Sequence, residues 1–372
     1  MTGARLQRTA ADCANAAMLA AALALLAGFF GTFHPALDSL AHFRAHLAVV
    51  SALLALALLA TNHRLLALSV LVFATVAFST TSSALTFLGL GRVEAGLGAA
   101  PADRATYRLL QMNLLFDNPS PEKVLSLIGR TKPDVVTVEE VSPMWRDKLA
   151  LLAAAYPHSV FCSYPRGYFG VAILSRRPLA PGAQPQCLER GALAIAKVDF
   201  GGTAVDVAAL HLRWPWPFRQ PQQIEAMAGP LGTLADTAIM AGDCNAATWS
   251  AAVRRVADAG GLKVMPSVGP TWLYYRLPEF LRFSGLPIDQ VFSKGGVLIH
   301  KAERLESTGS DHLPVLVDFS IRPGTPEEPD GERETAIAAA WPKLPPPCKG
   351  EEARTLTYSG RPAPRRPAAA PS

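Results

Sequence analysis

Short apolar segments separated by Pro, Gly and Asn occupy most of the chain between Tyr107 and Phe319. Several are rich in β-branched residues, and such segments form strands more readily than helices. We predict strands at 107–114, 135–138, 171–174, 192–200, 205–210, 238–240, 288–292 and 313–319. We predict helices at 121–131, 143–155, 220–236 and 247–259. Many strands with few helices predict an α+β fold of two packed sheets with the helices on their outer faces.

Polar residues capable of chemistry stand at or just beyond the ends of these strands. They are Asn113, Glu140, His211, Asp243, Asn245, Asp289, Asp311 and His312. Loops held by a rigid scaffold commonly carry catalytic groups, so we expect these side chains along one edge of the sheets. Acids, amides and two histidines are the groups that metal-assisted cleavage of a phosphate ester requires.

The first hundred residues differ in character, because most of the uncharged apolar sequence lies there. Segments 14–33 and 65–88 carry no charge and reach the roughly 20 residues needed to cross a bilayer. A shorter apolar segment lies at 44–61, with Arg44 and Arg64 able to reach the interface. We therefore predict a membrane region, residues 1–100, with three spans. A cleavable signal peptide is the alternative for the first span, because its front is basic.

Arg5 and Arg8 favour a cytoplasmic N-terminus. Three crossings would then place the catalytic domain, residues 105–321, on the periplasmic or extracellular side of the inner (plasma) membrane, and loss of the middle span would reverse this. Cys162 and Cys187 are able to pair across neighbouring strands if the domain is exported. The Pro-rich tail, residues 322–372, has too little apolar content for a core, so we predict that it is disordered.

Several different short motifs follow one another along the catalytic domain. They are Gln111-Met112-Asn113, the segments 133–141 and 170–176, Ala209-Leu210-His211-Leu212, Gly242-Asp243-Cys244-Asn245, Ile288-Asp289-Gln290-Val291-Phe292 and Ser310-Asp311-His312. Together they resemble the motifs of the endonuclease/exonuclease/phosphatase superfamily, the DNase-I-like fold, from about Tyr107 to Ser320. The resemblance implies a four-layer α/β/β/α sandwich of two packed mixed sheets and hydrolysis of phosphate esters with a divalent metal.

The chain departs from the family pattern in a few places. Glu139 stands where Gln is more usual, and Cys244 stands where Phe is common. Some nucleases of the fold pair the first catalytic His with an upstream Glu. The corresponding region here, around Gly167 to Gly170, has no carboxylate, so the sequence leaves the orientation of His211 open.

Mg²⁺ prefers oxygen ligands, and Mn²⁺ is the alternative ion. We expect Glu140, Asn113 and Asp311 to form the metal's oxygen shell. Asp243 would orient or deprotonate the attacking water, and Asn245 would hold a phosphate oxygen through its amide.

The histidines would act on the same phosphate. We expect Asp311 to hold His312, which would serve as a general acid/base or as a cationic donor, with His211 as a second donor. Asp289 would support this network or bind a second metal, and the sequence leaves both open. Arg190 would bind an anionic substrate oxygen in a forked geometry, unless it forms an ordinary surface pair.

Two aromatic segments leave alternatives open. Residues 213–220 alternate Trp and Phe with Pro between arginines, and residues 271–275 hold Trp and two Tyr. Such residues would stack bases, contact a lipid head group, lie at a membrane interface or pack on the domain.

We therefore predict a membrane-anchored, Mg²⁺-dependent phosphoesterase. Its substrate would be nucleic acid or a phospholipid head group, and its helices would contact the lipid bilayer. No basic run of the kind typical of nucleic-acid binding is visible, and the net charge of +5 is only modest. The rival prediction is a catalytically silent binding module of the same fold. Transport is disfavoured, because the predicted spans carry no internal charge.

Overall fold

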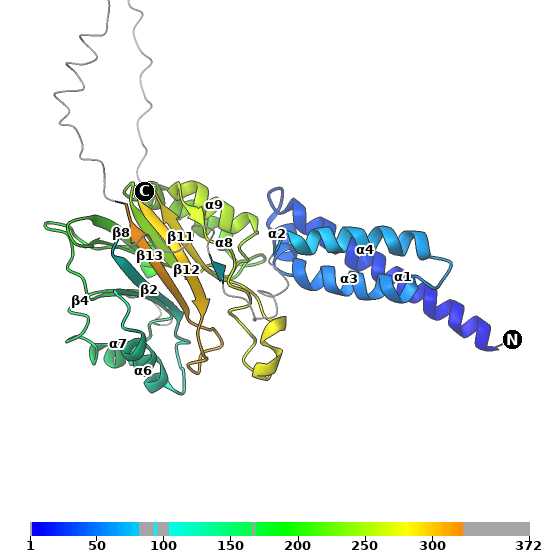
Figure 1. Cartoon of the computed structure of the whole chain (residues 1–372), viewed down its shortest axis with the longest axis horizontal. Helices are drawn as coiled ribbons and strands as arrows, with labels where there is room; N and C mark the ends of the chain where they lie inside the picture. The colour runs from blue at the N-terminus through cyan, green and yellow to red at the C-terminus, as the bar shows by residue number, and fades with distance from the viewer. Residues whose placement is uncertain (1, 82–92, 95–103, 166, 168, 323–372) are drawn as a thin grey trace, which may run out of the picture. The chain divides into compact units, whose positions relative to one another are not determined.

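The computed structural model describes residues 2–81, 93–94, 104–165, 167 and 169–322 (Figure 1). These residues belong to one compact unit, residues 1–324. The end of the third predicted span, 82–88, and all but the first residue of the predicted disordered tail lie outside the described residues.

The first sheet contains strands in the order β1-β12-β13-β2-β3-β5-β4. Its strands are β1 (Val93–Glu94), β2 (Thr106–Asn113), β3 (Val135–Glu139), β4 (His158–Cys162), β5 (Val171–Ser175), β12 (Val297–Arg304) and β13 (Val315–Ile321). The β2–β3 pair is parallel, and the neighbouring β13–β2 and β3–β5 pairs are antiparallel. The sheet is therefore mixed.

The second sheet is also mixed, in the order β10-β11-β9-β8-β7-β6. Its strands are β6 (Gln186–Leu188), β7 (Leu193–Asp199), β8 (Ala204–His211), β9 (Ala238–Asp243), β10 (Lys263–Val264) and β11 (Asp289–Lys294). The β8–β9 pair is parallel, whereas β9 and β11 are antiparallel. Both parallel pairs therefore end at the strand termini that carry the polar residues.

The two sheets pack face to face because alternate side chains along each strand point to opposite faces. Leu109 and Val207 lie in the core between the sheets, and both are fully buried. The next residue, Leu110, faces outward and packs with Trp145 of the covering helices. These are α6 (Pro121–Thr131) and α7 (Pro143–Ala150) on the first sheet, with α8 (Gln220–Gly232) and α9 (Ala251–Gly260) on the second (Figure 1). The predicted four-layer α/β/β/α sandwich is confirmed.

The N-terminal region is helical, with α1 (Thr2–Ala27), the 3₁₀ turn η1 (Gly28–Phe30), α2 (Pro35–Ala41), α3 (Arg44–Leu58) and α4 (Arg64–Ser79). Among the described residues, one helix is long and apolar enough to cross a membrane, Thr9–Phe30. The consecutive helices α2 and α3 qualify only together, with a bend of 64°, and α4 is a shorter apolar helix. The multi-pass arrangement is thus not established by helix length.

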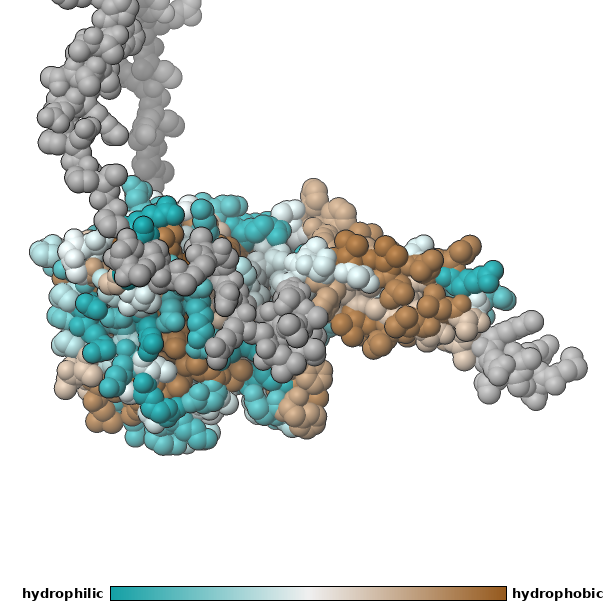
Figure 2. Space-filling model, in the orientation of Figure 1, coloured by the Kyte–Doolittle hydropathy of each residue, from teal (hydrophilic) through white to brown (hydrophobic). Residues whose placement is uncertain are grey.

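Helices α1, α3 and α4 lie side by side (Figure 1). Small residues dominate their shared interior, where Ala48, Ala55 and Ala67 are almost fully buried. Large apolar residues such as Leu23 and Leu65 point outward instead, and Figure 2 colours much of this exposed surface brown. Small residues inside and large apolar residues outside are typical of helices packed within lipid.

Candidate active site

Three acidic or basic side chains of the second sheet are neighbours through strand pairing. His211 at the end of β8 pairs with Asp243 at the end of β9, and Asp289 at the start of β11 pairs with the same Asp243. All three side chains are buried. The strand register alone therefore collects residues that lie up to 78 positions apart.

The first sheet contributes Asn113 and Glu140 from the parallel pair β2 and β3. Glu140 directly follows β3 with φ of +58°, which turns its side chain back towards the sheet end. Its carboxylate accepts hydrogen bonds from Asn113 Nδ2 at 3.1 Å and from the Phe116 N–H at 3.0 Å. A carboxylate is therefore fixed in place by two donors.

Two amides connect the sheets. Asn113 Nδ2 also donates to Asp243 Oδ2 at 3.0 Å. Gln111 Nε2 donates to Glu139 Oε2 and to Asp289 Oδ1, both at 2.8 Å. The polar groups of both sheets thus form one buried network between the strand ends.

Asp289, and not Asp311, holds His312. Asp289 Oδ2 lies 2.8 Å from His312 Nδ1, and His312 Nε2 lies 3.7 Å from Asp243 Oδ2. Asp311 instead accepts a hydrogen bond from Trp272 Nε1 at 2.8 Å. The expectation from sequence was wrong because adjacent residues of an extended segment point their side chains to opposite sides.

The surroundings of the two histidines shift their pKa values in opposite directions. Burial lowers the pKa of His312, but the carboxylates of Asp289 and Asp243 outweigh it and raise this pKa to about 10. Burial lowers the pKa of His211 to about 4, and the positive charge of His312 acts in the same direction. His312 is therefore an imidazolium and His211 a neutral imidazole.

Asp243 lies between these histidines, with His211 Nε2 at 3.6 Å from its Oδ2. Burial raises its pKa to about 7, although the His312 charge opposes the shift. The backbone N–H of Asn245 donates to Asp243 Oδ1 at 2.7 Å, and Asn245 Nδ2 donates to the Leu212 carbonyl at 2.8 Å. Asp243 is thus a carboxyl group able to exchange a proton near neutral pH.

The donor set fits a divalent cation. Carboxylates of Glu140, Asp243, Asp289 and Asp311 gather around one cationic side chain, His312, among the described residues of the site. Burial raises the pKa of Glu140, and the nearby charge of Asp311 adds to the increase, so a cation there would relieve an unfavourable charge. Carboxylate and amide oxygens are ligands that hard ions such as Mg²⁺ prefer.

The most compact group able to hold an ion differs from the predicted one. Ligand atoms of Asp243, Asp289 and His312 all lie within 4.8 Å of one another. His312 already bonds Asp289 and carries a proton, which makes this group a hydrogen-bonded network rather than a free ligand set. The Glu140 carboxylate lies at the edge of that network and is joined to it by Asn113 Nδ2, while Asn113 Oδ1 accepts a hydrogen bond from the Leu115 N–H at 3.0 Å.

His211 has a different neighbour from the carboxylate found in some nucleases. Its ring lies 5.6 Å from the Phe169 ring, and the Phe169 backbone forms a polar contact that favours the protonated ring. Gln223 Nε2 donates to the His211 carbonyl at 3.2 Å. The imidazole therefore packs against Phe169, while the Gln223 bond holds the backbone of His211.

Arg190 is not brought among the buried groups. It is exposed, and its guanidinium lies over the Tyr164 ring at 5.7 Å from the ring centre. Its assignment as a phosphate ligand stays a prediction. Sequence reasoning missed Gln111 as the link between the sheets, although this residue stands two positions before Asn113 in the first motif.

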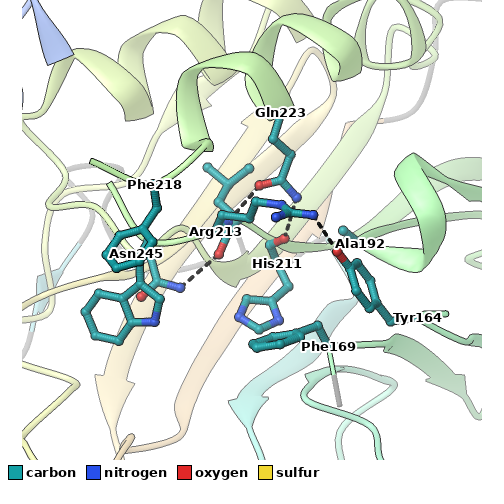
Figure 3. Close-up of a pocket in the computed structure, with 10 residues that line it drawn as sticks. Tyr164, Phe169, Ala192, His211, Arg213, Phe218, Gln223 and Asn245 are labelled. Atoms are coloured by element: carbon teal, nitrogen blue, oxygen red, sulfur yellow. Dashed lines mark hydrogen bonds between the residues drawn. The ribbon is translucent and has the colours of Figure 1, made fainter. Parts of the chain in front are cut away.

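An apolar cavity of about 260 Å³ opens beside His211 and Asn245 (Figure 3). Its walls are mainly aromatic, from Tyr164, Phe169, Trp214 and Phe218. Figure 3 shows the His211 ring next to Phe169, with Tyr164 on the same side of the cavity. The cavity can therefore receive an uncharged part of a molecule whose polar part lies at His211.

Residues 110–312 match the sequence model of the Endonuclease/Exonuclease/phosphatase family, and the chain belongs to this family. It is 33% identical over 128 residues to the UPF0294 protein VV2535 of Vibrio vulnificus (strain YJ016). That match covers 32% of this chain and 41% of the relative, so it spans less than half of the relative's length.

The fold is also seen in a solved structure. The endonuclease/exonuclease/phosphatase from Bacteroides vulgatus aligns with a TM-score of 0.50 at 16% identity, covering 59% of this chain and all (100%) of that chain. The one from Beutenbergia cavernae DSM 12333 gives 0.48 at 22% identity, covering 59% of this chain and 72% of that chain.

Proposed function

We propose that this protein hydrolyses phosphate ester bonds with the help of a divalent cation, Mg²⁺ or Mn²⁺. Asn113, Glu140 and Asp311 would hold the ion. When bound, the ion would polarise a phosphoryl oxygen and neutralise charge that builds up on the phosphate. The surplus of carboxylates over cations in the site supports this assignment.

The single observation that carries the proposal is the placement of two buried histidines on Asp243, with His211 Nε2 at 3.6 Å and His312 Nε2 at 3.7 Å from its Oδ2. His312 would donate a proton from Nε2 towards a phosphate oxygen, because Asp289 occupies its Nδ1. Neutral His211 would donate a hydrogen bond to the same phosphate. Asp243, with its pKa of about 7, would orient water and accept its proton.

Asn245 would stabilise the phosphate through the amide N–H that makes the longer hydrogen bond, 3.4 Å to Asp243 Oδ2, since the Leu212 carbonyl takes the other hydrogen at 2.8 Å. Asp289 would act as a positioning residue through His312 instead of as a second metal ligand. The hydrogen bond to His312 supports this choice between the two alternatives.

We also propose that α1, α3 and α4 embed in a bilayer and that residues 1–100 anchor the catalytic domain, residues 105–321. The candidate span at Thr9–Phe30 and the outward-facing large apolar residues of all three helices support it. The Cys162–Cys187 disulfide, with Cα atoms 5.3 Å apart, supports a location in an oxidising compartment outside the cytoplasm.

The experiment uses the full chain in detergent with Mg²⁺, and compares bis-(p-nitrophenyl) phosphate, plasmid DNA, RNA and phospholipids. Turnover that EDTA abolishes and that His312→Ala lowers supports hydrolysis. Asp318→Asn, on β13, is the control for a change in charge. A folded wild-type protein that turns over none of these substrates would support the rival, a silent binding module.

Labelling with a membrane-impermeant thiol reagent tests the side of the membrane. After reduction, the exposed Cys187 in intact cells should react if the domain is exported. Labelling that appears only after lysis would contradict export.

A further inference from the structure

We propose that the protein surface around the active-site opening lies against the bilayer surface, so that the substrate is a phosphate ester presented by that bilayer. The proposal rests on the hydrolysis and the membrane anchoring proposed above. It chooses a lipid surface over nucleic acid as the partner of the two aromatic segments, 214–218 and 274–283.

Exposed large apolar side chains are concentrated in these two segments. They are Trp214, Trp216, Phe218, Tyr274, Tyr275, Leu277, Phe280 and Phe283. Elsewhere in the described part of 104–322, the large apolar residues that are exposed are Phe116, Leu151 and Phe169. Phe280 is 76% exposed and Phe218 is 61% exposed, values unusual for side chains of this size in a domain surrounded by water. We call the two segments together the aromatic rim.

The aromatic rim borders the active site. The Trp214 ring lies 5.6 Å from the Trp272 ring, and Trp272 Nε1 donates to Asp311 of the site. Trp214 and Phe218 also line the apolar cavity beside His211. Whatever contacts the rim is therefore next to the catalytic groups.

The rim is also tied to the N-terminal helices. Ser39 Oγ of α2 donates to the Trp216 carbonyl at 3.2 Å, and His46 Nε2 of α3 lies 2.9 Å from the Ser284 carbonyl. One hydrogen bond reaches the middle of the first segment, and the other reaches the residue that directly follows the second. Both segments are consequently held at the same end of the helical region.

At that end of the helical region α1 and α4 end and α3 begins. The Arg44 guanidinium, at the start of α3, donates to Thr80 beyond α4 and to the carbonyl of Gly28 beyond α1. At the other end, His63 pairs with Asp12 at 3.3 Å. Polar groups thus close both ends of an otherwise apolar bundle.

The distance between these ends is somewhat shorter than the hydrocarbon core of a bilayer. From Asp12 to Gly28 helix α1 rises roughly 24 Å at 1.5 Å per residue, compared with about 30 Å for a hydrocarbon core. The Arg44 end therefore lies near one interface, and the hydrogen bonds from Ser39 and His46 place the aromatic rim at that level. Trp and Tyr are enriched at this depth of a membrane.

Charge on the rim agrees with lipid head groups. Arg213 and Arg219 flank the first segment, and Arg276 lies within the second. Glu279 is the acid within the second segment, and it is neutralised by Arg282 at 2.7 Å. Aromatic and cationic side chains together favour an anionic lipid surface.

The substrate class follows from the cavity. A phosphate at His211 and His312 would leave the neighbouring uncharged part of the molecule beside Phe169 and Trp214. In a phospholipid a glycerol unit joins the phosphate to the apolar chains, so an apolar part lies close to the phosphate. The cavity and the rim therefore favour the same partner.

Fluorescence quenching in vesicles tests the placement. Full-length protein carrying Cys13→Ser and Cys348→Ser would receive a single reactive cysteine by Phe280→Cys or Trp216→Cys, labelled with the fluorophore NBD. Of the three remaining native cysteines, Cys244 is buried and Cys162 and Cys187 are paired. Leu151→Cys is the matched control, because Leu151 is 71% exposed and lies at the end of α7, outside the rim.

The labelled proteins are reconstituted into vesicles of phosphatidylcholine and phosphatidylglycerol that contain nitroxide-labelled lipid. We expect loss of emission at positions 280 and 216 and no loss at 151. Quenching by the same amount at all three positions, or no quenching at any of them, overturns the proposal. A change at 280 and 216 with single-stranded oligonucleotide, without quenching by the lipid, also overturns it and identifies nucleic acid as the partner.

The same preparations are assayed on bis-(p-nitrophenyl) phosphate with Mg²⁺, which separates the two proposals. Hydrolysis without quenching at the rim refutes the membrane contact and leaves the enzyme activity standing. Quenching without hydrolysis refutes the proposed activity and supports the membrane contact. Retention of the wild-type melting temperature excludes misfolding of the labelled variants as the cause.

Discussion

Asp289→Asn is the substitution whose effect the structure specifies most fully. It keeps the size of the side chain and removes one charge from a buried pair with His312, whose Nδ1 lies 2.8 Å away. It also alters the hydrogen bond from Gln111. We expect His312 to lose its proton at neutral pH and the enzyme to lose activity.

The magnitude follows from the pKa of His312, which rises from 6.5 to about 10. At 1.36 kcal/mol per unit, this shift corresponds to about 5 kcal/mol in favour of the imidazolium. Without Asp289 the remaining carboxylate is Asp243 at 3.7 Å, and burial acts against the charge. Loss of a positioned acid typically lowers kcat/KM about 10²- to 10⁴-fold.

The direction in which kcat/KM of Asp289→Asn changes with pH follows from the direction of the His312 pKa shift. A group whose pKa is raised by folding stabilises the folded state below its unfolded pKa, and this contribution is lost as pH rises through the folded pKa. In the wild type, His312 therefore keeps its proton up to about pH 10. In Asp289→Asn the pKa of His312 is lower, so the deficit in kcat/KM should grow between about pH 6 and pH 9.

Steady-state hydrolysis of bis-(p-nitrophenyl) phosphate across that pH range provides the assay. Asp318→Asn is the matched control, because it makes the same change on β13 at an ion pair with Arg108. A variant at 289 with wild-type kcat/KM at every pH would refute the reasoning. A deficit independent of pH would show that Asp289 acts only through packing.

Other substitutions and treatments test separate parts of the account. Glu140→Gln should abolish the rise in melting temperature that Mg²⁺ gives the wild type, and an undiminished rise would exclude this carboxylate as a ligand. Reducing the Cys162–Cys187 bond should lower the free energy of unfolding by about 3.5 kcal/mol in the chain-entropy view, because it closes a loop of 25 residues. Denaturant curves with and without reductant check this, and coincident curves would contradict it. Asp38→Ala should lower stability by about 1–2 kcal/mol, since its carboxylate accepts from two N–H groups at the start of α9 at 2.6 and 2.9 Å. Unchanged thermal unfolding would rule that out.

Local sequence patterns predicted the sandwich well, because most of its strands are buried on both faces. The run 135–138 corresponds to β3, and helix α6 begins and ends where its spacing and Pro121 predict. Strand β12 was missed, since its Lys301, Glu303 and Arg304 interrupt the apolar run. The predicted helix at 247–259 begins later, at residue 251, where Ser250 provides the N-cap.

Motifs at strand ends predicted most of the residues that meet in the candidate site, but they did not predict the hydrogen bonds between them. Strand ends and motifs identified the residues, but hydrogen-bond partners depend on sheet order and side-chain direction. Gln111 and Asp289 are 178 positions apart and meet only because the two sheets pack together. The adjacent Asp311 was an attractive partner for His312 in sequence, yet an extended backbone turns it towards Trp272.

The pKa values of the histidines were equally out of reach of the sequence. Both imidazoles are buried, and burial alone would lower both pKa values. The difference arises because His312 has Asp289 at 2.8 Å, whereas His211 faces an aromatic ring and a backbone group. The pKa of each histidine therefore depends on the groups that the packed sheets place beside it.

A diffraction structure with Mn²⁺ and phosphate, recorded for its anomalous signal, is the most direct test of how the site works. The account predicts a metal peak bonded to the Glu140 carboxylate, with phosphate between His211 and His312. A peak coordinated by Asp289 and His312 without Glu140, or phosphate bound away from both histidines, would contradict it.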